Sequence, residues 1–176
     1  DTYKLIADLP LDRRVIEMKK DEIKKKILSE DPIKGSTFPL INRIGYTQMY
    51  RFGSPPNYNP EPEESIESMA KEKGITAAEL AYEILIENDG NNFIYAPLVN
   101  YADHTFGVCK KMLDDKNAIM GLGDGGAHVG FILDAGYPTW LISYWSVKQK
   151  AYSMEETVRR LTSDTANAAG LNDRGR

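Results

Sequence analysis

The sequence has little of what metal centres and cross-links are made from, with one cysteine and two histidines in 176 residues. Because Cys109 has no second thiol to pair with, an internal disulfide and a multi-cysteine zinc site are both excluded. A single thiol is typical of a reducing compartment, so we expect a cytoplasmic protein. No apolar run reaches the roughly 18 residues that a transmembrane helix needs, and no signal peptide is recognisable. We therefore expect no membrane contact.

The sequence also lacks an excess of basic charge, because its formal net charge is −4. A nucleic-acid surface would require clustered lysines and arginines, so nucleic acid is not an expected partner. The lysines between positions 19 and 26 alternate with acidic residues and predict a solvated helix face. The hydrophobic fraction of 41% and charged fraction of 27% are those of a folded globular domain.

The first third of the chain predicts a helix followed by an irregular insertion. Residues 8–30 carry a loose apolar stripe of helical spacing, and Asp31-Pro32 would stop this helix. Residues 31–62 hold six prolines and also five aromatic side chains, at positions 38, 46, 50, 52 and 58. A disordered linker would not carry that many rings. We therefore expect a packed, ordered loop with a short central helix or strand.

Start and stop signals in the sequence predict several helix boundaries in the rest of the chain. A short helix from residue 63 should end at Gly74, and Thr76 with Glu79 forms a capping box for the next helix. That helix should end at Asn88-Asp89-Gly90. Residues 137–149 are predicted to be helical. The last helix should start at Ser153 with Glu156 and end at Gly170, followed by Leu171.

Two apolar runs of strand length, 93–99 and 118–122, flank a predicted helix at 105–114. A strand, a helix and a strand in this order predict a parallel pair with a right-handed crossover. The predicted fold class is therefore α/β and predominantly helical, in one compact unit over residues 1–176. Two parallel strands cannot complete a sheet, which indicates a piece of a larger fold. We expect their edges to pair between copies or to be covered by the loop at 31–62.

The glycine-rich run Gly121-Leu-Gly-Asp124-Gly-Gly-Ala-His128 follows the second predicted strand directly. In parallel α/β folds the active site forms beyond the carboxyl ends of the strands, so Asp124 is placed to be a metal ligand or general base. The alternative is an Asx turn at Asp124 with His128 as an ordinary polar neighbour. The run also matches the dinucleotide fingerprint G-x-G-x-x-G, but glycines and a proline interrupt the helix that must follow, and an ionised Asp124 would repel a pyrophosphate.

The glycine-rich run continues into a longer and more specific pattern. It is followed by Val129-Gly130, by Asp134-Ala-Gly-Tyr-Pro138-Thr139 and by Trp145. This stretch resembles the strand-8 region of the N-acyl-D-amino-acid deacylase (D-aminoacylase) branch of the amidohydrolase superfamily. Three further stretches are similar to parts of these proteins: Leu9-Pro10-Leu11-Asp12-Arg13-Arg14-Val15, Asp89-Gly90 with Pro97-Leu-Val-Asn100-Tyr101, and Leu161 to Arg176.

The resemblance implies the last strands of a (β/α)8, or TIM, barrel preceded by a helix and an insertion at 1–62. It implies a hydrolase in which Asp124 contacts a catalytic zinc ion and transfers the proton of its water. The implied reaction is hydrolysis of the amide bond of N-acyl-(D-)amino acids. His128 and Asn100 are candidates for the substrate pocket. Cys109 is expected in the core, and His104 in a solvated or capping role.

The chain departs from the family pattern where the metal should be held. The family binds zinc mainly through a His-x-His pair and further histidines, whereas this chain has two histidines and no such pair. We therefore expect zinc in a full-length parent, none bound by this chain, and no activity of the chain alone. Both ends resemble cuts within a longer protein, and exposed barrel edges predict self-association. The alternative is a stand-alone helical binding or interaction domain whose glycine-rich loop is only a turn.

Overall fold

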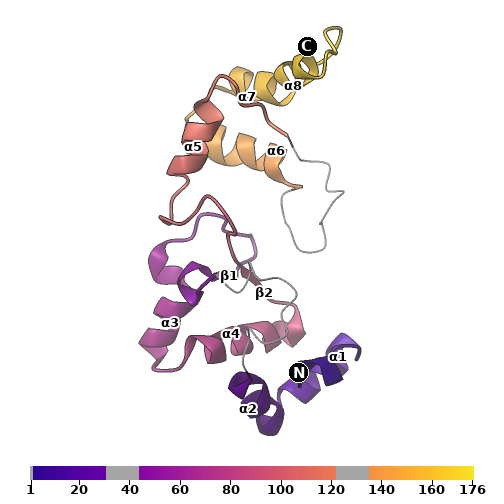
Figure 1. Cartoon of the computed structure of the whole chain (residues 1–176), viewed down its shortest axis with the longest axis vertical. Coiled ribbons are helices and arrows are strands. Elements are labelled where there is room, and N and C mark those ends of the chain that lie inside the picture. Colours follow the sequence, from indigo (N-terminus) through magenta and orange to yellow (C-terminus); the bar gives the residue numbers. More distant parts are fainter. Residues whose placement is uncertain (1, 31–43, 122–134) are drawn as a thin grey trace. The chain divides into compact units, whose positions relative to one another are not determined.

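A computed structural model describes residues 2–30, 44–121 and 135–176 of the chain, which is mostly helical with one small sheet (Figure 1). The chain divides into two units, residues 1–108 and 109–176, and each is described by itself. The predicted α/β, predominantly helical class is confirmed at this level. The prediction of one compact unit over the whole chain stays a prediction. No helix of the described ranges is long and apolar enough to cross a membrane.

The N-terminal helix predicted over 8–30 is two helices, α1 (Leu11–Met18) and α2 (Asp21–Ser29), after a 3-10 turn η1 (Tyr3–Leu5). The break lies at Lys20, whose backbone is extended. A hydrogen bond at the end of α1 and an acidic residue at the start of α2 explain this break. The Tyr82 hydroxyl donates to the Met18 carbonyl oxygen at 2.7 Å and so satisfies an acceptor at the end of α1. Asp21 then lies in the first turn of α2, where an acidic side chain complements the helix dipole.

The core of the first unit is a pair of helices, α3 (Ile66–Lys73) and α4 (Ala77–Ile86), that follow the 3-10 turn η4 (Pro62–Glu64). Their facing sides bury five apolar side chains: Ile66, Ala70, Leu80, Ala81 and Ile84. The predicted boundaries at Gly74, Thr76 and Asn88–Gly90 are confirmed, whereas α3 begins at Ile66 and not at residue 63. Gly74 has a φ of +67° and closes α3, and the Thr76 side chain accepts a hydrogen bond from the Glu79 backbone at 3.2 Å. α4 ends just before the turn η5 (Asn88–Gly90).

The only strands of the described residues are β1 (Tyr50–Phe52) and β2 (Phe93–Tyr95), and they are antiparallel. Tyr50 pairs with Tyr95 and Phe52 with Phe93. Tyr50 also forms an isolated antiparallel bridge with Ser65, the residue that caps α3. Beside this bridge the Ile66 backbone N–H donates to the Met49 oxygen at 2.8 Å. The start of α3 is thus joined to the sheet.

The predicted parallel pair of 93–99 with 118–122 is wrong. The partner of β2 comes from the insertion at 31–62, the segment expected to cover the strand, and it pairs with Phe93–Tyr95. Its described part, 44–62, also holds the expected short helix, η3 (Tyr46–Gln48). Residues 118–121 form no strand. A turn precedes them, in which Asp115 accepts from the Asn117 and Ala118 backbones, and Ile119 is 58% exposed, whereas parallel strands are buried on both faces.

The second unit packs helices around aromatic side chains. It contains most of α5 (Gly107–Asp114), then α6 (Tyr137–Trp140), the π-helix η6 (Leu141–Lys148), α7 (Met154–Leu161) and α8 (Ser163–Ala168). The predicted last helix is interrupted at Thr162, which has non-helical backbone angles. Gly170 ends α8 as predicted. Its N–H donates to Asn167 and that of Leu171 to Ala166, which is the Schellman pattern.

In this unit, contacts of the Tyr152 side chain with charged residues join α5 to α7. The Tyr152 hydroxyl donates to Asp114 at 2.9 Å, and the charged groups of Lys110 and Arg160 lie 4.7 and 4.4 Å from the centre of its ring. Arg160 also donates to the Leu113 oxygen at 2.6 Å. Each cation over a phenol face adds on the order of 1 kcal/mol.

Replacement of Gly90 tests the packing of η5 against α1. It has a φ of +77°, and a Cβ there would lie 2.6 Å from Val15 and 3.0 Å from Leu11. Gly90→Ala should therefore lower the free energy of unfolding by about 1–3 kcal/mol more than Gly74→Ala. Gly74 is the matched control, because it shares the positive φ but has no atom within 4 Å of the added Cβ. Urea denaturation measures both, and equal losses would contradict the close approach.

The pKa of Asp114 predicts how the stability of the folded protein changes with pH. Its pKa lies below the ordinary value because Lys110 and then Tyr152 hydrogen-bond to the carboxylate. A pKa that is lower in the folded state stabilises the protein above the unfolded value of about 3.9, and this contribution is lost as the pH falls through the folded pKa. The stability advantage of the natural chain over Asp114→Asn should thus be full above about pH 5 and shrink toward pH 2. A difference independent of pH, in urea denaturation at each pH, would contradict it.

Candidate functional site after strand β2

The loop at residues 96–106 leaves the carboxyl end of β2 and holds three residues of interest: Asn100, Tyr101 and His104. Asn100 and His104 have positive φ angles of 62° and 57°, in the left-handed region that few side chains adopt. Such a conformation costs free energy and persists where neighbouring contacts hold it in place. Two such residues four positions apart give this loop a defined, sharply folded path.

Tyr101 anchors the loop to the first unit. Its side chain is 2% exposed, and its hydroxyl lies 3.0 Å from the Pro60 oxygen and 3.1 Å from the Asn59 side-chain oxygen. Its own carbonyl oxygen accepts from the His104 backbone N–H at 3.1 Å and from the Gln48 side chain at 3.5 Å. Residues 48, 59 and 60, all from the irregular insertion, thus hold a residue of the loop after β2.

His104 contacts a buried phenol. The Tyr50 hydroxyl and His104 Nδ1 are 2.6 Å apart, and Tyr50 is 1% exposed. The His104 ring makes edge-to-face contacts with Tyr50 and with Tyr101, at centroid distances of 6.4 and 6.3 Å. Because Nδ1 is engaged, Nε2 is the nitrogen left to meet a ligand. A histidine ring held in this way presents its second nitrogen in one direction.

The protonation of Tyr50 is set by its surroundings. Burial raises the pKa of its phenol, and the negative charge of Glu64 raises it further. Tyr50 is therefore a neutral hydroxyl throughout the physiological range. It acts on His104 as a hydrogen-bonding group and does not carry charge.

The three residues predicted for the site have different outcomes. Asn100 lies in the loop just described and is exposed. Asp124 and His128 lie outside the described residues. Cys109 is on α5 and is half-buried. His104 was expected to be solvated or capping and instead contacts Tyr50, which is 54 positions away in sequence. No local pattern joins these two residues, although the aromatic content of 31–62 indicated that its rings pack.

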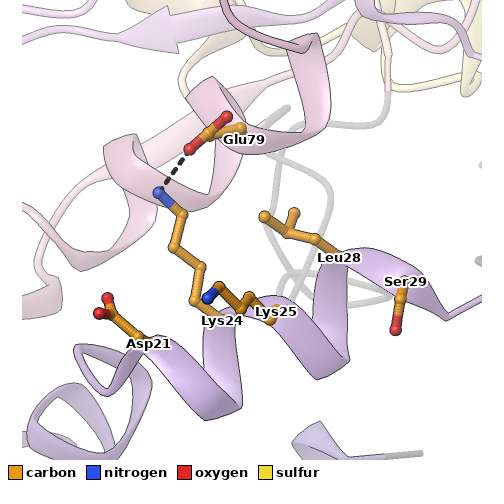
Figure 2. A pocket seen from close by; sticks show the side chains of 6 residues that line it. All are labelled: Asp21, Lys24, Lys25, Leu28, Ser29 and Glu79. Atoms are coloured by element: carbon orange, nitrogen blue, oxygen red, sulfur yellow. Dashed lines mark hydrogen bonds and ion pairs between the residues drawn. The ribbon is translucent and has the colours of Figure 1, made fainter.

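A hollow of about 500 Å³ lies between α2 and α4 (Figure 2). Figure 2 shows Lys24 extending from α2 to Glu79 on α4. Its ammonium donates to Glu79 at 2.8 Å and to Glu83 at 3.1 Å, and these two carboxylates raise the Lys24 pKa. Two carboxylates already neutralise this cation, so we assign it a structural role in joining the helices.

The described ranges contain no group of three or more histidine, cysteine, aspartate or glutamate side chains that could hold a metal ion. Comparison of the chain with protein-family models finds no match, and comparisons with curated proteins and with solved structures find none either.

The anchoring role of Tyr101 has a direct test. Tyr101→Phe keeps the ring and removes a hydroxyl that satisfies the buried Pro60 oxygen, so it should cost about 1–3 kcal/mol of unfolding free energy. Tyr58→Phe is the matched control. Tyr58 also belongs to the insertion and its ring packs against Phe52 and Tyr95, but its hydroxyl makes no hydrogen bond to a described residue. Equal stabilities of the two variants in urea denaturation would show that Tyr101 is not an anchor.

Proposed function

We propose that the chain is part of a zinc-dependent amidohydrolase that hydrolyses the amide bond of N-acyl-(D-)amino acids. The observation that carries this proposal is the run from Gly121 to Thr139, in which Asp124 and His128 stand among closely spaced glycines. Glycines allow a ligand to approach the backbone, and the run resembles the strand-8 region of the N-acyl-D-amino-acid deacylases. The (β/α)8 barrel of the parent is part of the proposal and rests on this resemblance alone.

In this proposal Asp124 is the general base and then the general acid. Its carboxylate takes a proton from the attacking water while the water oxygen bonds to the amide carbon. The same proton then passes to the amide nitrogen, the carbon–nitrogen bond breaks, and a carboxylate and a free amino acid leave. All atoms are accounted for by one water molecule. An aspartate carries out both transfers only if it lies within hydrogen-bond reach of both the water and the leaving nitrogen.

The donor set of the described residues does not fit a zinc ion. Zinc takes three or four histidine, cysteine or carboxylate ligands, and no such group occurs in the described ranges. In our proposal the other ligands come from outside this chain, in a longer parent protein. We therefore assign no chemical step to the metal within this chain.

In this proposal the loop after β2 binds the substrate. Loops at the carboxyl ends of strands hold substrates in barrel enzymes, and in the proposed barrel residues 96–106, which follow β2, would be such a loop. Asn100 is exposed there, and a side-chain amide both donates and accepts hydrogen bonds. It suits a ligand that contains an amide and a carboxylate.

Replacement of Asp124 in the full-length protein tests the reaction. Asp124→Ala should lower kcat for release of amino acid from an N-acyl-D-amino acid by about 10²–10⁴-fold, since that is the usual contribution of a general base. Asp173→Ala is the control and should leave kcat unchanged, because Asp173 is exposed and among the described residues its side chain pairs only with neighbouring Arg174. Unchanged turnover in Asp124→Ala would defeat the proposal.

Experiments on the 176-residue chain alone test the proposal that it lacks part of the catalytic site. We expect zinc calorimetry to show no tight binding at a single site, and we expect no release of amino acid, because two histidines cannot complete the site. Tight one-site binding together with turnover would show that the chain is a complete enzyme.

A stand-alone helical binding domain is the alternative function. The observation in its favour is that α3 and α4 bury their core against residues between 46 and 94, without any part of a barrel. The turnover of the full-length protein discriminates between the two, because a binding domain would not hydrolyse N-acyl amino acids at any measurable rate.

A further inference from the structure

Strand β2 has two edges, and within the described ranges only one of them is paired with a strand. β1 lies along this edge, and no described strand lies along the other, which we call the second edge. An edge strand presents N–H and C=O groups that can serve as a template for a further strand. The insertion at 31–62 therefore covers β2 from one side and leaves the second edge for another partner.

A backbone hydrogen bond beside Tyr50 determines which groups of β2 face the second edge. The Ile66 N–H donates to the Met49 oxygen at 2.8 Å, so Met49 directs its carbonyl group toward the start of α3. Successive residues of a strand direct their polar groups to opposite sides, so those of Tyr50 face its partner Tyr95 on β2. Tyr50 and Tyr95 are then a hydrogen-bonded pair. Ile94, one position earlier on β2, therefore directs its N–H and C=O away from β1.

The side chains of β2 leave the second edge accessible. Outside the sheet, the backbone of Ile94 makes no hydrogen bond to a described residue, and its side chain packs against the core of α3 and α4. Phe93 and Tyr95 lie on the opposite face of the sheet, because side chains alternate along a strand. Phe93 is 65% exposed. Residues 91–100 carry no charged side chain, although natural edge strands are commonly protected by lysine or another charge.

We propose that the second edge of β2 pairs with the same edge of a second copy of this chain, antiparallel about a two-fold axis at Ile94. In this register the two Ile94 residues exchange both of their hydrogen bonds. Phe93 of each copy lies opposite Tyr95 of the other, as a non-hydrogen-bonded pair whose Cα atoms approach to about 4.5 Å. The two aromatic pairs cover the exposed Phe93 rings, and such cross-strand pairs stabilise a sheet.

The charge and the size of the second edge favour a second copy as the partner and also limit its affinity. A two-fold axis brings each side chain close to its own counterpart, so a charge on the strand would meet a like charge. Residues 91–100 have no such charge, although the whole chain carries a net charge of −4. A three-residue edge buries far less than the roughly 1,200 Å² of a stable interface. The dimer is therefore weak, with a dissociation constant on the order of micromolar to millimolar.

Sedimentation and nuclear magnetic resonance of the 176-residue chain, between about 0.02 and 2 mM, test this pairing. The mean mass should rise toward that of a dimer. The Ile94 amide hydrogen should exchange at least about twofold more slowly at the higher concentration, whereas that of Tyr95, which already faces β1, should not. In a mixture of labelled and unlabelled chains, the Phe93 Hα should show a nuclear Overhauser effect to the Tyr95 Hα of the other copy. A constant monomer mass, Ile94 exchange independent of concentration, or absence of this effect would each overturn the proposal.

Replacement of Phe93 separates edge pairing from general apolar association. Phe93→Lys removes the ring and puts like charges on the two copies, so it should weaken association at least about tenfold. Ile119→Lys is the matched control, because Ile119 is also apolar and is 58% exposed but lies in no strand. It should leave association unchanged, and both variants should keep the helical circular dichroism. Unweakened association of Phe93→Lys, or equal weakening by Ile119→Lys, would show that the second edge is not the interface.

A mixture of two charged variants tests the two-fold register and excludes misfolding as the cause of lost association. The axis at Ile94 places residue 93 of one copy diagonally across from residue 93 of the other, within reach of long side chains. An equimolar mixture of Phe93→Lys and Phe93→Glu should therefore associate at least about threefold more tightly than either variant alone. A mixture that associates no more tightly would overturn the register. The pairing involves no residue of the proposed hydrolysis, so its outcome is independent of turnover by the full-length protein.

Discussion

The burial of Tyr50 is the contact on which the first unit depends most. Its backbone pairs with Tyr95 of β2 and bridges to Ser65 at the start of α3, and its hydroxyl engages His104. At 1% exposure its ring lies fully inside the unit, and truncation of such a ring costs on the order of 3–5 kcal/mol. One side chain therefore joins the sheet, the helix pair and the loop after β2, and the geometry of the candidate site follows from its position.

Short-range signals predicted helix ends well, because the groups that decide them are three to five residues apart. Gly74, Thr76 and Gly170 end or begin helices where the sequence indicates, and each contact lies within one turn of its residue. The single helix expected over 8–30 failed for the opposite reason. The hydroxyl that satisfies the end of α1 comes from Tyr82, which is 64 positions away, and no local pattern contains that information.

The largest error concerned strand pairing. Its cause is again that the residues in contact lie far apart in the sequence. An apolar run predicts a buried strand, but it does not name its partner or its direction. The partner of β2 lies in the proline-rich insertion, about which the sequence indicated only that its rings pack. The same limit applies to the site. Asn100 was identified by resemblance, and Asp124 and His128 lie outside the described residues. The pairing of His104 with Tyr50 required a contact between segments far apart in sequence.

Ser65 has a consequence for how the first unit opens. It caps α3 with its side chain, bridges to Tyr50, and is followed by an N–H that donates to Met49. The first turn of α3 and strand β1 therefore cannot separate without breaking the same set of contacts. Amide hydrogens on both should exchange with solvent through one common opening free energy, as a single cooperative unit, although one belongs to a helix and the other to a sheet.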